Sequence, residues 1–330
     1  MTRTVIGVGV AVLAAGGLIV WGVLADRPEE LSASEPAEQA VATLESADAV
    51  LEGVQTLIRT GESDRALAVL DAAVRTYPDD RELRLAFAEL LVGRGEPGEA
   101  YAQYEVAITA GEPEAAVEFK AGGAAGLMGD REKAAAHYAK AAELEPGNAD
   151  YAETLGLSLI GINDLEAAKV SLLRATAVDP DRGRSWGALA EIALRQNSTG
   201  LARQHARRAQ QSQPGVAAWR VIEARALKRE GSVEDALLLL LAIEGTSRTP
   251  AILRATAECY GLLELPGEAE AMYVEAAGNA ATAVAGELWR EAALWAERAG
   301  DLDSALRHAR SAAAFGDEAG AKIAARLGGG

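Results

Sequence analysis

Two patterns of apolar residues divide the chain. The first is an uncharged run, "VIGVGVAVLAAGGLIVWGVL", which extends over twenty residues from Val5 to Leu24. About twenty apolar residues are what an α-helix needs to cross a hydrocarbon layer. In the second pattern apolar residues recur at intervals of three and four, as in "EKAAAHYAKAAELEP" at residues 132–146. That spacing is typical of helices and not of strands, so the pattern predicts one apolar N-terminal helix followed by many amphipathic ones.

The charges around the apolar run predict its orientation. Arg3 and the amino terminus precede it, whereas three acidic residues and only Arg27 follow it closely. The positive-inside rule then leaves residues 1–4 as a cytoplasmic stub and carries the remainder across the membrane. A cleaved signal peptide is the alternative, because Val23–Ala25 resembles a cleavage site. We expect an uncleaved signal anchor in a bacterial inner membrane, followed at residues 25–46 by an acidic flexible linker that runs into the first helix.

The helical part of the chain repeats with a period of about 34 residues. One row of small residues shows it: Ala66, Ala100, Ala134, Ala168, Ala202, Ala236, Ala269 and Ala305. Five residues before each alanine stands Gly or Asn in seven of the eight cases, and the exception is Glu264. Gly and Asn tolerate the left-handed backbone that ends a helix. Each unit is therefore predicted to be a helix, a tight turn and a second helix. The residues predicted to cap second helices are Ser63, Asp164, Ser232 and Asp301.

This pattern resembles the tetratricopeptide repeat (TPR) family, in which a small residue at position 8 packs against alanine at position 20. With Ala66 as position 20, the repeats begin near residues 47, 81, 115, 149, 183, 217, 250 and 286. The resemblance implies an all-α, right-handed α-solenoid of about eight repeats over residues 47–318, with the transmembrane helix in front of it. Residues 319–330 are expected to form a C-terminal capping helix and a glycine tail.

Composition excludes several classes of function. The net charge of -17 argues against nucleic-acid binding. A single cysteine, Cys259, permits neither an intrachain disulfide nor a cysteine zinc cluster, and we expect it in the core. The three histidines stand far apart without ligand spacing, which favours packed or solvated helix positions. We find no catalytic motif, and therefore expect no enzyme activity, no cofactor and no metal.

The resemblance places partner binding in a groove lined by the first helix of each repeat, at positions 2, 5, 9 and 12. The candidate residues there are Phe119, Gly123, Gly126, Glu153, Leu157, Arg184, Arg225, Lys228, Arg254 and Arg290. Residues 182–229 add to the basic end, since they hold ten basic residues and two acidic ones. The arginines permit two interpretations: they hold the carboxylates of a bound peptide, or they pair with Glu258, Glu287 and Glu291.

The two glycines also permit two interpretations. Gly123 and Gly126 either let a partner's backbone approach closely, or are substitutions without a binding role that weaken the helix.

Together these features predict a membrane-tethered TPR scaffold that binds protein or peptide partners, for envelope assembly, secretion or protein maturation. Three alternatives remain: a cytoplasm-facing regulator of a membrane enzyme, a non-catalytic subunit of a complex that processes glycans or the envelope, and a homo-oligomer that occupies its own groove.

Overall fold

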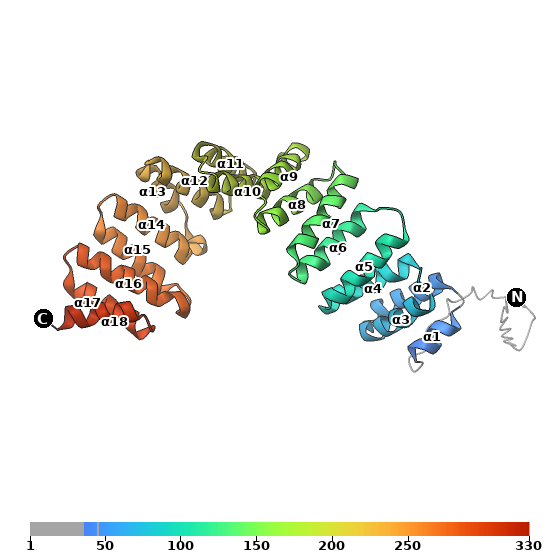
Figure 1. Cartoon of the computed structure of the whole chain (residues 1–330). Coiled ribbons are helices and arrows are strands. Elements are labelled where there is room, and N and C mark those ends of the chain that lie inside the picture. The colour runs from blue at the N-terminus through green and yellow to red at the C-terminus, as the bar shows by residue number, and fades with distance from the viewer. Residues whose placement is uncertain (1–35, 45, 330) are drawn as a thin grey trace, which may run out of the picture. The chain divides into compact units, whose positions relative to one another are not determined.

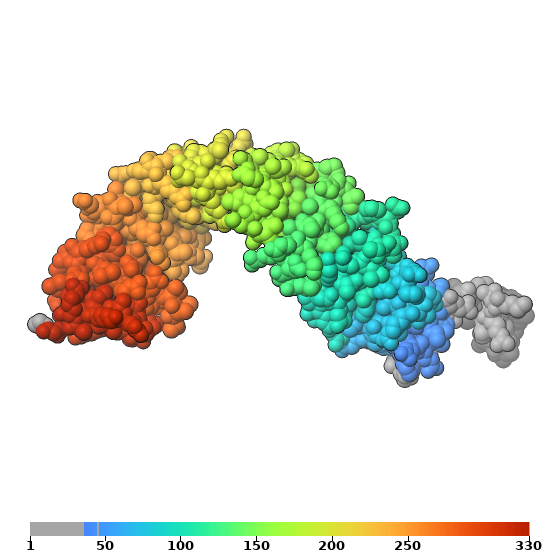
Figure 2. Space-filling model, viewed as in Figure 1, coloured from blue at the N-terminus to red at the C-terminus, as the bar shows by residue number. Residues whose placement is uncertain are grey.

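The computed structural model describes residues 36–44 and 46–329, which form helices and no strand. They fall into two compact units that meet in sequence at His137 and Tyr138. Within each unit the colours of Figures 1 and 2 follow chain order, as expected when every repeat packs on its sequence neighbours. The predicted anchor, Val5–Leu24, lies outside the described residues. In the part of the chain that is described, no helix is both long and apolar enough to cross a membrane.

The first unit holds α1 to α6, and α7 begins in it. Their bounds are α1 (Ala37–Thr43), α2 (Ala47–Arg59), α3 (Ser63–Thr76), α4 (Arg81–Arg94), α5 (Pro97–Ala110), α6 (Ala115–Leu127) and α7 (Arg131–Leu144). The second unit continues with α8 (Ala149–Gly161), α9 (Leu165–Val178), α10 (Gly183–Arg195), α11 (Thr199–Ser212), α12 (Ala217–Glu230), α13 (Val233–Leu241), η1 (Gly245–Ser247), α14 (Pro250–Leu262), α15 (Pro266–Gly278), α16 (Thr282–Arg298), α17 (Leu302–Ala314) and α18 (Glu318–Gly328).

The predicted repeat boundaries agree with these helices. The first helices of repeats one to seven begin at the expected residues, from Ala47 to Pro250. In repeat eight, α16 begins at Thr282 instead of 286, because residues 282–285 are compatible with a helix and extend it by a turn. The capping helix predicted at the C-terminus is present as α18.

The tight turns adopt the left-handed backbone at every predicted position. Their φ angles are 83° at Gly61, 82° at Gly95, 83° at Gly129, 63° at Asn163, 57° at Asn197, 84° at Gly231, 61° at Glu264 and 83° at Gly300. Glu264, the exception in the sequence pattern, therefore takes the same conformation as the glycines. A residue with a side chain pays about 1–2 kcal/mol for that conformation. The free energy gained by forming this turn therefore exceeds the conformational cost at Glu264.

The small residues of the repeat form the core. The repeated alanines at position 20 are all buried, for example Ala66 and Ala202 with no exposed surface. Gly156, at position 8 of repeat four, has no room for a side chain, because a Cβ there would lie 2.6 Å from Cγ of Leu172. Cys259 is 1% exposed, which confirms its place in the core, and burial raises the pKa of its thiol.

The expected linker is partly wrong. Residues 37–43 form α1, which packs on α3 and buries Ala40, Val41 and Leu44. These three residues are spaced by one, three and four positions, so one helical face is apolar, and α1 covers the open end of the first repeat. The described helices therefore begin at Ala37, ten residues before the first repeat.

Three of the four predicted helix caps stand at the N-cap position, and two of them form the capping hydrogen bond. Asp164 and Asp301 accept hydrogen bonds from the backbone N–H groups of Ala167 and Ser304, at 3.1 and 2.9 Å. Ser63 instead lies inside α3, and Ser232 stands at the N-cap of α13 without a side-chain hydrogen bond.

Candidate binding faces on the first helices

The predicted binding residues divide between the two units. Phe119, Gly123 and Gly126 lie on α6 in the first unit. The other seven lie on first helices of the second unit: Glu153 and Leu157 on α8, Arg184 on α10, Arg225 and Lys228 on α12, Arg254 on α14 and Arg290 on α16. We therefore describe two separate faces.

In the second unit, ion pairs connect each first helix to the next. Arg225 Nη1 of α12 lies 2.9 Å from Glu191 Oε2 of α10. Lys228 Nζ of the same helix lies 2.7 Å from Glu258 Oε2 of α14. We call these two pairs, together with Arg254–Glu287 and Arg290–Asp317, the first-helix ladder.

The ladder continues to the C-terminal cap. Arg254 Nη1 of α14 lies 3.2 Å from Glu287 Oε1 of α16. Arg290 Nη1 of α16 then lies 2.7 Å from Oδ2 of Asp317, the N-cap residue of α18. Pairs that are this exposed contribute about 0.2–1 kcal/mol each, so the ladder aligns neighbouring repeats more than it stabilises them.

The ladder favours the second of the two interpretations of the arginines. Arg254 pairs with Glu287 as that interpretation expects, whereas Arg225 uses Glu191 instead of Glu258. Arg290 approaches Glu291 only at 3.4 Å and Asp317 more closely. A partner's carboxylate would have to displace an intramolecular carboxylate at each of these residues.

The other cations of residues 182–229 also pair with groups of the chain itself. Eight of its ten cations have a partner: Arg182 with Asp150, Arg195 with Glu191, Arg203 with Glu230, Arg207 with Glu223, Arg220 with the carbonyl of Ala242, Arg225 with Glu191, Lys228 with Glu258 and Arg229 with the carbonyl of Leu194. Only Arg184 and Arg208, both exposed, make no side-chain hydrogen bond or ion pair with any described residue. The segment is therefore mainly occupied in joining repeats.

The remaining candidates of the second unit are partly buried. Glu153 accepts a hydrogen bond of 2.6 Å from the hydroxyl of Ser185 on α10, and its side chain is 13% exposed. Leu157 is half-buried on α8. Neither residue is as accessible as the prediction of a peptide contact implies.

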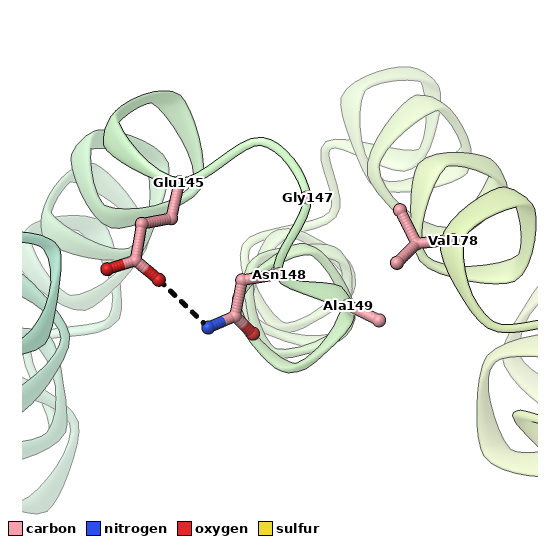
Figure 3. A pocket seen from close by; sticks show the side chains of 5 residues that line it. All are labelled: Glu145, Gly147, Asn148, Ala149 and Val178. Atoms are coloured by element: carbon pink, nitrogen blue, oxygen red, sulfur yellow. Dashed lines mark hydrogen bonds between the residues drawn. The ribbon is translucent and has the colours of Figure 1, made fainter.

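Two shallow hollows on the described surface show no arrangement typical of catalysis. One, of about 580 Å³, lies beside the turn before α8 and is lined by Glu145, Gly147, Asn148, Ala149 and Val178. Figure 3 shows Asn148 donating its amide hydrogen to Glu145, at 3.1 Å. The other hollow, of about 600 Å³, runs along α11 beside Arg203, Arg207 and Arg208. Among the described residues, no group of three acidic, histidine or cysteine side chains is placed to hold a metal ion.

All three histidines occupy one register, which the sequence interpretation missed. Each follows the repeated alanine by three residues, so His137, His205 and His308 are equivalent. His205 and His308 stack on Trp186 and Trp289, with ring centroids 5.4 Å apart. The spacing from the alanine row was the signal that could have found them.

The third histidine is held by polar groups. Nδ1 of His137 lies 2.6 Å from the buried carboxylate of Glu118, and its Nε2 lies 3.0 Å from the hydroxyl of Tyr101. Glu118 stands where the other two repeats have tryptophan. These contacts confirm that the histidines are packed helix positions.

Comparison with known proteins agrees with this architecture. Two tetratricopeptide repeat models match residues 47–90 and 153–217, and a search of the curated proteins found no match. YrrB, a TPR protein with an unusual peptide-binding site, is 19% identical with a TM-score of 0.50, over 56% of this chain and 96% of its own. A TPR protein from Parabacteroides merdae is 15% identical with a TM-score of 0.51, over 74% and 98% of the two chains. The chain therefore contains tetratricopeptide repeats in an all-helical solenoid.

Proposed function

We propose that this chain is a membrane-tethered TPR scaffold whose first-helix faces bind protein or peptide partners. The observation that carries the proposal is the repeat itself, which presents equivalent first-helix positions to solvent every 34 residues or so. Such a surface suits an extended partner that contacts several repeats in turn. YrrB, whose fold is similar, is itself described as having a peptide-binding site.

The tether is the second part of the proposal. The uncharged run from Val5 to Leu24 would act as a signal anchor in the inner membrane of a bacterium and keep the repeats on the outer side. Anchoring raises the effective concentration of the scaffold toward other envelope proteins. This placement supports a role in envelope assembly, secretion or protein maturation. We propose no enzyme activity for the chain itself.

Reporter fusions test the orientation. A reporter that is active only outside the cytoplasm, fused after Gly330, should give signal, and a reporter active only in the cytoplasm should not. The opposite result would contradict the orientation and favour the cytoplasm-facing regulator.

Photo-crosslinking tests the binding face. A photoreactive amino acid is placed at the exposed positions Gln55 of α2 or Arg184 of α10 in the full chain, in its native membrane. Matched positions on second helices are Glu99 of α5 and Gln204 of α11. We expect protein crosslinks from the first-helix positions, and crosslinks from the second-helix positions alone would refute the proposed face.

A further inference from the structure

The first-helix face of the first unit has a different chemistry from the ladder. Six residues at equivalent positions of α2 and α4 define it: Asp48 with Glu82, Leu51 with Leu85, and Ile58 with Val92. Each pair is separated by 34 residues, and α2 contacts α4. The face therefore carries one acidic row and two apolar rows that run from one repeat to the next.

The apolar rows are accessible. Ile58 is 46% exposed. Leu51, Leu85 and Val92 are half-buried, since they pack against the core on one side and reach solvent on the other. Isolated exposed apolar residues are ordinary, but here they recur in register on adjacent helices, which makes a continuous strip.

The acidic row lacks internal cations. Asp48 and Glu82 are exposed, and neither side chain forms an ion pair or hydrogen bond with any described residue. Both stand in the first turn of a helix, where a negative charge is favourable by about 0.3–1 kcal/mol. In repeat four Asp150 occupies the same position and has Arg182 as a partner at 2.8 Å, so a carboxylate at this position can hold a cation.

The charge of the face selects its occupant. The segment between the apolar run and α1 does not match it in charge, because Asp26, Glu29, Glu30 and Glu35 outnumber Arg27. The ladder of a second copy is also unsuitable, since its cations already have carboxylate partners. A partner that supplies cations together with aliphatic groups would satisfy both kinds of row.

The spacing of the rows limits the form of this partner. Packed helices lie about 8–10 Å apart, so we expect equivalent backbone positions on α2 and α4 to be separated by about that distance. In a polyproline II segment, residues three apart lie on one side and are about 9 Å apart. One cation at every third residue would therefore meet the acidic row, and the residues between them would meet the apolar rows.

We propose that the first-helix face of the first unit binds an extended basic segment of a partner protein, with Lys or Arg at every third position and aliphatic residues between. The inference rests on the proposed scaffold function and names the partner class. It also moves the expected contact from the arginines of the second unit to the carboxylates of the first.

Two synthetic peptides test the proposal. One is made of four Lys-Val-Pro units with a fluorophore, and the other replaces each Lys with Glu. Binding to the full chain, purified in non-ionic detergent, is measured by fluorescence anisotropy. We expect the Lys peptide to bind and the Glu peptide to bind at least tenfold more weakly.

A charge-matched pair of variants localises the site. Asp48→Lys with Glu82→Lys should weaken binding of the Lys peptide at least tenfold. Glu99→Lys with Glu132→Lys makes the same charge change in the first turns of two second helices, α5 and α7, where both carboxylates are exposed and unpaired with any described residue. This control should change the affinity less than threefold, and circular dichroism should show that both variants keep their helices.

Each alternative outcome overturns the proposal. Equal weakening in both variants would mean general attraction to an acidic protein. Preference for the Glu peptide would reject a basic partner but leave peptide binding intact. Binding of neither peptide would also reject the inference, while the crosslinking experiment would still judge the scaffold function. A dimer in sedimentation that Asp48→Lys with Glu82→Lys dissociates would make a second copy the occupant.

Discussion

The carboxylate of Glu223 on α12 is buried, and two side chains of α11 hold it. Arg207 donates from Nε at 2.6 Å and Gln210 from Nε2 at 2.9 Å, while the side chain of Glu223 is 5% exposed. The Arg207→Ala change would leave this charge with a single neutral donor. We therefore expect the second unit to lose stability.

The magnitude follows from the exposure of the two partners. Breaking a fully buried ion pair costs about 3–5 kcal/mol. Arg207 is 58% exposed, so solvent screens the attraction, and Gln210 keeps one hydrogen bond. We expect a loss of about 2 kcal/mol in the free energy of unfolding.

The assay is urea denaturation of the full chain, followed by circular dichroism. The matched control is Arg208→Ala, which removes the neighbouring exposed guanidinium that has no partner among the described residues, and should change the stability by less than about 0.5 kcal/mol. Adding Glu223→Gln to Arg207→Ala should recover part of the loss, because the buried charge is removed. Equal effects of the two single changes would refute the reasoning.

Three further predictions concern turns, glycines and pH. Glu264→Gly should stabilise the chain by about 1 kcal/mol in urea denaturation, since φ is 61° there; a loss would contradict this. Gly156→Ala should lower the melting temperature, because the new Cβ would lie 2.6 Å from Cγ of Leu172. Gly126→Ala should raise the melting temperature, because it removes a helical glycine and its Cβ would meet only Ala134, at 3.8 Å. An equal fall in both variants would contradict this prediction. The pKa of His205 is lowered mainly by burial and also by Lys169. Its contribution to stability is therefore present above the unfolded-state pKa of about 6.5 and is lost as pH falls toward the folded-state value. Urea midpoints at about pH 7.5 and 5.5 should differ more in the wild type than in His205→Gln, and equal differences would exclude the histidine.

The repeat register could be predicted because it depends on local constraints. A left-handed turn needs Gly or Asn, and a close helix contact needs Ala, so both leave a mark at fixed spacing. Glu264 shows the limit of this approach, because the turn is imposed there by the packing of its neighbours. The helix α1 was not predicted for another reason. Its apolar face is short and follows an acidic, proline-containing segment, and its role becomes evident only from its packing on α3.

The binding residues were less predictable than the fold. The positions of Arg225 and Arg254 on first helices followed from the register, but their partners did not. A long side chain can reach carboxylates on two helices, and the choice depends on distances that the spacing does not fix. The sequence also could not predict that Asp48 and Glu82 have no ion-pair partner, since several basic residues lie close to them in the chain.

The ladder also means that the repeats are not interchangeable modules. Glu191, Arg225 and Glu258 occupy equivalent positions in three successive repeats, and their charges alternate. Excising the middle repeat would keep every helix, turn and alanine contact in phase but would bring Glu191 beside Glu258. Loss of this one repeat, in evolution or in engineering, would thus conserve the backbone pattern and replace an attractive electrostatic contact between repeats with a repulsive one.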